Sequence, residues 1–124
     1  MHKGDIIFIR DYRFHSTWET RDKFFIVLSD TEKYLDVIFV FTTSKTDKYS
    51  PLPEESKVII PLGTFEFFPK ETIVVVHNIH QVDRKEFESY AQENKGIIPA
   101  HLLSQIIEKV KKSTLVKPYI KRLL

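Results

Sequence analysis

Two short segments of this chain are apolar at every position, and they restrict the folds that it can adopt. Residues 24–28 read Phe-Phe-Ile-Val-Leu, and residues 37–41 read Val-Ile-Phe-Val-Phe. Aromatic and β-branched residues favour strands, and a strand that is apolar on both faces needs a cover on each. The two segments therefore predict central strands whose second face is covered by a helix or a partner.

Other segments of strand length lie around these two. The expected strands cover residues 5–10, 23–29, 34–42, 57–61 and 72–77, with charged or turn-forming residues between them. This pattern is typical of an all-β barrel or sandwich. A length of 124 residues, with 42% hydrophobic and 29% charged residues, fits one folded domain of ordinary size. We expect a single domain over residues 1–124, mainly β or α+β in class.

Two helices are expected in the second half of the chain. Asp83 with Glu86 forms a capping box, and the short helix that follows should carry its apolar side chains on one side. A longer helix is expected over about residues 99–113, because apolar residues recur there as a single stripe. The side chains on one side of the short helix are Phe87, Tyr90 and Ala91, and the stripe is Leu102, Leu103, Ile106, Ile107 and Val110.

Charge is nearly balanced, with 19 Lys and Arg against 17 Asp and Glu, for a formal net charge of +2. The whole-molecule field therefore gives no strong argument for a nucleic acid, and an anionic partner would need a local cluster. Such a cluster follows Glu108, where the basic residues have no acidic neighbour. The segment 114–124 is both basic and apolar, so it is either a solvated end or an exposed docking element. The basic residues are Lys109, Lys111, Lys112, Lys117, Lys121 and Arg122.

The chain contains no cysteine, which excludes disulfides, thiolate metal sites and a cysteine nucleophile. This suits a reducing compartment. The first apolar run ends at Arg10, too early for the core of a signal peptide. The longest apolar runs also fall short of the roughly 20 residues that span a bilayer. A cytoplasmic protein without a membrane segment is expected.

Several short motifs occur in an order and spacing that resemble the MazF/PemK toxin family. They are Lys-Gly-Asp-Ile-Ile at residues 3–7, a long polar loop, Phe-Ile-Val-Leu-Ser at 25–29, Thr-Thr-Ser-Lys at 42–45, and Ile-Val-Val-Val at 73–76 leading to Val-Asp-Arg at 82–84. Lys-Gly-Ile-Ile-Pro at 95–99 resembles the way in which that family enters its final helix. The resemblance covers roughly residues 3–113.

The resemblance implies an SH3-like barrel, usually a homodimer, that cleaves single-stranded RNA without a metal or another cofactor. It also implies an antitoxin protein as partner, laid across the RNA groove. The chain departs from the family at one important place. Where the family has Arg-Pro before the second strand, this sequence has Lys23 and Phe24, and the glycines of the preceding loop are missing.

Metal-free RNA cleavage requires a base for the 2′-hydroxyl, an acid for the leaving oxygen and fixed positive charge at the phosphate. The resemblance assigns the phosphate contact to Thr43 and sets Lys23 at the family's arginine position. Arg21 can supply a second cation, and either Glu19 or His15 can serve as the base. A shared groove at the Lys23 and Thr43 ends of two adjacent strands is the geometric condition for this chemistry.

RNA affinity would come from the same region. Trp18 can stack on an unpaired base, while Arg13, Ser44 and Lys45 can contact the backbone. The alternative is a barrel of the same kind that binds RNA or a protein without cleaving, and a third hypothesis is a pure protein-interaction module. His77 and His80 form a His-x-x-His pair, but on a strand such residues point to opposite faces, so no metal site is expected there.

Overall fold

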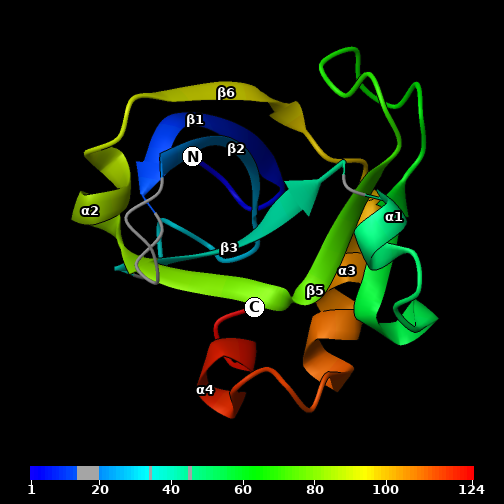
Figure 1. Cartoon of the computed structure of the whole chain (residues 1–124). Helices are drawn as coiled ribbons and strands as arrows, with labels where there is room; N and C mark the ends of the chain where they lie inside the picture. Colours follow the sequence, from blue (N-terminus) through cyan, green and yellow to red (C-terminus); the bar gives the residue numbers. More distant parts are fainter. Residues whose placement is uncertain (14–19, 34, 45) are drawn as a thin grey trace.

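The computed structural model describes residues 1–13, 20–33, 35–44 and 46–124. Six strands form one antiparallel sheet in the order β4-β5-β3-β2-β1-β6. The sheet curls into a half-barrel, which confirms the mainly β, barrel-like fold expected from the sequence (Figure 1). The strands are β1 (Asp5–Arg13), β2 (Thr20–Val27), β3 (Asp36–Thr43), β4 (Lys57–Ile60), β5 (Thr72–Asp83) and β6 (Gln92–Ile97).

Helices are short except for one. They are α1 (Thr46–Tyr49), the 3-10 helix η1 (Glu54–Ser56), α2 (Arg84–Glu88), α3 (Ala100–Lys112) and α4 (Pro118–Lys121). Asp83 caps α2 as expected, because its carboxylate accepts the amide of Lys85 at 2.8 Å. The helix ends at Glu88, however, so Tyr90 and Ala91 lie beyond it.

One strand of the sheet was not expected. Residues 92–97, Gln-Glu-Asn-Lys-Gly-Ile, form the edge strand β6 and pair with β1. Most of its side chains are exposed, and only one edge is hydrogen-bonded to a neighbour within the sheet. A polar edge strand lacks the apolar alternation by which buried strands are recognised. This strand is defined by its backbone pairing with β1 and not by its side-chain pattern.

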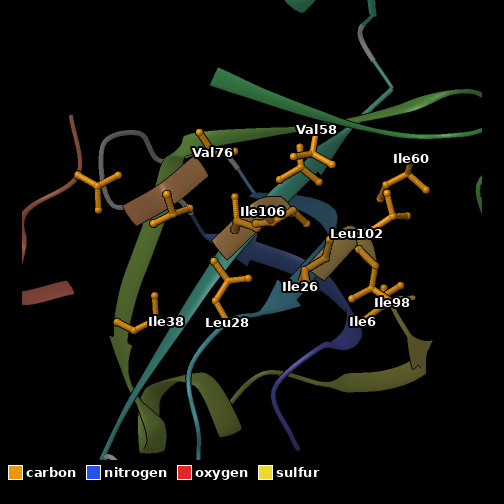
Figure 2. Close-up of a cluster of buried hydrophobic side chains, with 14 of the residues drawn as sticks. Ile6, Ile26, Leu28, Ile38, Val58, Ile60, Val76, Ile98, Leu102 and Ile106 are labelled. Carbon is orange, nitrogen blue, oxygen red and sulfur yellow. The ribbon is translucent and has the colours of Figure 1, made fainter. Parts of the chain in front are cut away.

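The first face of the sheet, here called the aliphatic face, is covered by α3. Leu102, Ile106 and Val110 of the helix are buried against side chains from β1, β2, β3, β4 and β5. Figure 2 shows the isoleucine, leucine and valine side chains of this cluster pointing toward one another. The expected apolar stripe of the last helix is therefore what closes this side of the core.

The opposite face, here called the aromatic face, is built around stacked and edge-on rings. Phe25 and Phe39 are fully buried, with ring centroids 4.6 Å apart. Phe87 from α2 packs on Phe39 at 5.3 Å, and Tyr12 approaches Phe25 at 5.0 Å. The aliphatic face of the central strands is thus covered by α3, and the aromatic face by Phe87 together with side chains of the curled sheet itself, which answers the requirement raised by their sequences.

A β-bulge in β1 brings Tyr12 onto the aromatic face. The register with β2 shifts between Ile9 and Tyr12, and Asp11 has a φ of 54° within the shift. Aspartate tolerates this left-handed region better than most residues do. The amide of Asp11 donates to the carboxylate of Asp22 at 3.0 Å, which holds the bulge. The extra residue makes Tyr12, rather than Asp11, follow Ile7 and Ile9 on the buried side.

The C-terminal segment differs from the exposed docking element that its composition suggests. Val116 and Ile120 are buried in the aliphatic cluster, and Leu123 and Leu124 pack against it. Pro118 begins α4, which carries Ile120, while Val116 lies in the bend that precedes the helix. Only part of the expected exposed apolar surface remains, at Leu115 and Tyr119.

The burial of Tyr12 makes the fold less stable at high pH. Burial, together with Tyr90 and Glu86 nearby, raises the pKa of Tyr12 from 10.0 to about 12. The folded state keeps the proton of the Tyr12 hydroxyl to a higher pH than the unfolded state does. The stability that the protonated hydroxyl contributes is therefore fully present below pH 10 and is lost as the pH rises toward 12. The rise from 10.0 to about 12 corresponds to a loss of at most roughly 2–3 kcal/mol of unfolding free energy over this window.

Urea denaturation across the same range measures this loss, with Tyr12→Phe as the reference because its ring cannot ionise. The other ionisable side chains are common to both proteins, so the informative quantity is the difference between the two pH profiles. Parallel profiles for the wild type and Tyr12→Phe would contradict the assignment to Tyr12.

Candidate functional site

The strand register sets Lys23 beside Thr43. In the β2–β3 pair, Phe25 lies opposite Phe41, and the same register continued toward the start of β2 sets Lys23 opposite Thr43. The hydroxyl of Thr42 donates to the carbonyl of Phe24 at 3.4 Å, which keeps the two strand ends together. Lys23 and Thr43 are each half-buried, and they fall on the same side of the sheet.

A pocket of about 200 Å³ opens at this point and is here called the cationic pocket. Lys23 and Thr43 both line it, together with Arg21, which lies two residues before Lys23 on the same side of β2. Lys48 of α1 brings a third positive charge. No acidic side chain occurs among its described lining residues, which are Arg21, Lys23, Phe41, Thr42, Thr43, Lys48, Tyr49, Val75 and Asn78.

A bend in β5 forms one wall of the cationic pocket. The register between β3 and β5 shifts between Val40, which lies opposite Ile79, and Thr42, which lies opposite Val74. The strand is visibly bent at its middle in Figure 1. Extra residues on one strand of a pair bend it and change where its side chains point. Val75 and Asn78 reach the pocket from this bend.

Two buried or partly buried lysines hold the segment that follows α1. The ammonium of Lys57 donates to the carbonyl of Ser50 at 2.7 Å, and only 7% of this residue is exposed. Lys109 of α3 donates to the carbonyls of Glu54 and Lys57, at 2.7 and 2.9 Å. These bonds tie the segment after α1 to β4 and α3. Lys48 and Tyr49 are therefore carried by a segment anchored at several points.

A second pocket of about 340 Å³ shares Lys23, Thr42 and Thr43 with the first and is here called the aromatic pocket. Its character is different, because Phe24, Phe67 and Phe68 form much of its wall. Phe24 points to the side of β2 opposite Lys23. Both residues line the aromatic pocket, but the described lining of the cationic pocket includes Lys23 and not Phe24. The described lining residues are Asp22, Lys23, Phe24, Thr42, Thr43, Ser44, Phe67, Phe68, Pro69, Lys70 and Thr72.

The site residues expected from the sequence fall into three groups. Lys23, Thr43 and Arg21 meet in the cationic pocket, and Ser44 lines the aromatic pocket. Arg13 is exposed opposite Thr20 on the β1–β2 ribbon, and the described lining of neither pocket includes it. Four expected residues lie outside the described residues: His15, Trp18, Glu19 and Lys45.

Other lining residues were not expected from the sequence. Lys48 and Tyr49 come from the segment after Thr43, whose only signal was its closeness to that residue in the chain. Asn78 reaches the pocket because β5 is bent, and no pattern in the sequence predicts that bend. Asp22 is a carboxylate directly before Lys23 and lines the aromatic pocket. It joins Glu19 and His15 as a group with the chemistry of a base.

The two histidines of the His-x-x-His pair have different surroundings. The ring of His80 stacks on Phe39 at 5.7 Å and meets Phe41 edge-on at 4.4 Å. The Nδ1 atom of His77 is buried without a hydrogen-bond partner among the described residues. Among all the described residues, no group of three or more His, Cys, Asp or Glu side chains is arranged to hold a metal ion.

A search for helices that could cross a bilayer gives a negative result for the described residues, because none is both long and apolar enough.

Comparisons with known proteins bear on the fold. No protein-family model matches the sequence, and no curated protein sequence matches it significantly. Two solved structures are similar over 89% of this chain. One is a chain of the MazE-MazF structure from Deinococcus radiodurans, at 14% identity and a TM-score of 0.64, with 91% of that chain covered. The other is MazF from the same organism, at 16% identity and a TM-score of 0.60, with 92% covered. The chain therefore has the fold of the MazF toxins.

Proposed function

We propose that this protein is a toxin-like, metal-independent endoribonuclease that cleaves single-stranded RNA. The observation that supports the proposal most is the convergence of Lys23 and Thr43 on the same two pockets, with Arg21 and Lys48 beside them. The similarity in fold to MazF also supports the proposal. Three cations without a carboxylate in the described lining suit a pentacovalent phosphate, whose charge grows in the transition state.

In this proposal each side chain has a defined task. Lys23 and Arg21 neutralise the phosphate, and either can protonate the leaving 5′-oxygen. The hydroxyl of Thr43 donates to a phosphate oxygen, and Asn78 and Lys48 complete the set of donors around it. The 2′-hydroxyl then needs a base, for which His15, Glu19 and Asp22 are the candidates. Histidine is the side chain that most often serves as a general base, which favours His15.

The partners follow from the same proposal. The MazE-MazF structure has a similar fold to this chain, so we propose a small antitoxin protein that occupies the RNA groove. We also propose a homodimer and a cytoplasmic location. Because both faces of the sheet are covered within the chain, a dimer would form through other surfaces, and light scattering at micromolar concentration measures its mass.

The direct test is expression followed by an assay with purified protein. We expect induced expression to arrest bacterial growth, and the purified protein to fragment a labelled single-stranded RNA in buffer containing a chelator. The same sequence made as a duplex should resist cleavage, since the 2′-hydroxyl must approach its phosphate in line. Intact RNA after prolonged incubation with folded protein would refute the nuclease activity.

A second candidate function is RNA binding without cleavage. It is favoured by one observation, namely that Lys23 and Phe24 stand where the family has Arg-Pro. A lysine is a mobile point charge and lacks the fixed fork of arginine, so it holds a phosphate less rigidly. This alternative predicts saturable, salt-sensitive retention of labelled RNA with no turnover. Retention and turnover are measured in the same samples, which separates the two functions.

A further inference from the structure

The two pockets share a wall, and this arrangement indicates that the site binds more than a phosphate. Lys23, Thr42 and Thr43 line both pockets, so a phosphate held by Lys23 and Thr43 would have the aromatic pocket directly beside it. In single-stranded RNA, the group attached next to each phosphate is a nucleoside with an unpaired base. The two adjoining pockets therefore match the phosphate and the base of one nucleotide.

The aromatic wall is preassembled by ring contacts between two distant parts of the chain. Phe67, from the segment that connects β4 to β5, stacks on Phe24 of β2 with centroids 5.5 Å apart and an interplanar angle of 15°. Phe68 meets Phe24 edge-on at 5.0 Å, and Phe65 stacks on Phe67 at 4.9 Å. A wall built from rings that already hold one another loses little conformational freedom when a ligand binds.

The rest of the pocket suits a flat, partly polar ligand. Pockets of about 300–1,000 Å³ with apolar walls and a few polar groups are typical ligand sites, and this one has about 340 Å³. Lys70 and Lys23 bring positive charge to its lining, and Ser44, Thr72 and Asp22 bring hydrogen-bonding groups. Aromatic surface beside positive charge is the usual combination for binding single-stranded nucleic acid.

We propose that the aromatic pocket is a subsite for an unpaired nucleobase of the RNA, next to the phosphate at Lys23 and Thr43. The inference rests on the proposed function and extends it from a phosphate contact to recognition of a base. A protein segment is the other possible occupant. The base is favoured because the two pockets adjoin at Lys23, Thr42 and Thr43, so that one nucleotide can reach both.

The experiment uses the full chain and short single-stranded RNAs in which one nucleotide at a time lacks its base. Removing the base that enters the aromatic pocket should lower kcat/KM at least about fivefold, while abasic nucleotides elsewhere have smaller effects. Phe67→Leu, which keeps an apolar side chain but loses the ring, should lower kcat/KM on intact RNA by a similar factor. It should then be nearly insensitive to the abasic position.

Leu62→Ala is the matched control, because Leu62 lies in the same connecting segment, is 67% exposed and is absent from both described linings. The thermal unfolding midpoint of each variant shows whether the fold is intact. If wild-type protein cleaves intact RNA but tolerates an abasic nucleotide at every position, the base subsite is wrong and the nuclease proposal stands. The same holds if the effect of the abasic position is unchanged in Phe67→Leu.

If the wild type cleaves no RNA, the nuclease proposal fails, and fluorescence anisotropy with the same oligonucleotides tests the subsite separately. Weaker binding of one abasic RNA by the wild type, and not by Phe67→Leu, would support a base subsite in a non-catalytic binder. Binding that is equal for all the oligonucleotides would overturn it. Competition by an acidic peptide, with equal affinity for all the RNAs, would identify a protein segment as the occupant.

Discussion

Replacing Lys23 with alanine is expected to lower kcat/KM for single-stranded RNA by about 10²–10³-fold, the usual loss for one preorganised group facing transition-state charge. Lys23 is half-buried between two pockets, and among the described residues it is the charged side chain that lines both. Thr43→Ala removes a hydroxyl donor to a charged oxygen and should cost roughly tenfold to a hundredfold. Single-turnover cleavage of an end-labelled RNA measures both losses.

Conservative variants separate chemistry from folding in this experiment. Lys23→Arg keeps the charge and adds the planar fork, so its activity should equal or exceed that of the wild type. Thr43→Ser keeps the hydroxyl and should retain most of the activity. Lys111→Ala removes a lysine of α3 that lines neither described wall of the site and serves as the control for net charge. Undiminished cleavage by the Lys23→Ala, Thr43→Ala double variant would exclude this site.

Replacing Phe25 with alanine is expected to lower the free energy of unfolding by about 3–5 kcal/mol. The side chain is fully buried at the centre of the aromatic face, in ring contact with Tyr12, Phe39, Phe41 and Phe87. Truncation leaves a cavity that four surrounding rings cannot all move to fill. Such a loss is a large part of the stability of a domain of this size, and urea denaturation measures it.

The control for this prediction is Tyr119→Ala, an aromatic truncation on the surface. Tyr119 is 48% exposed, so its loss should change the unfolding free energy by no more than about 0.5 kcal/mol. A change below about 1 kcal/mol in Phe25→Ala would mean that the aromatic face is less closely packed than its ring distances indicate.

Most strands and the main helix could be predicted from the sequence because the spacing of apolar residues within each segment indicates which side chains are buried. β3 is apolar on both sides, and α3 carries one stripe that matches its buried residues Leu102, Ile106 and Val110. β6 and α4 were missed for a common reason. The polar β6 is defined by its pairing with β1, and α4 by the burial of Val116 and Ile120 against strands far away in the chain.

The candidate site was predictable only in part. Lys23 and Thr43 were identified because the resemblance placed them at two strand ends, and the strand register then brings them together. Lys48, Asn78 and the aromatic wall depend on a bend in β5 and on loop contacts. A bulge depends on how two paired strands accommodate one another, which the spacing of residues within a single strand does not reveal.

The cover of the aliphatic face has a consequence for how the protein is made. All six strands precede α3 and α4 in the chain, so a ribosome completes the sheet before it delivers the helices that shield Ile26, Ile38 and Val40. Until then, the nascent polypeptide presents an uncovered aliphatic surface. Such intermediates aggregate readily and are substrates for chaperones. The yield of native protein should therefore rise with chaperone supply during synthesis.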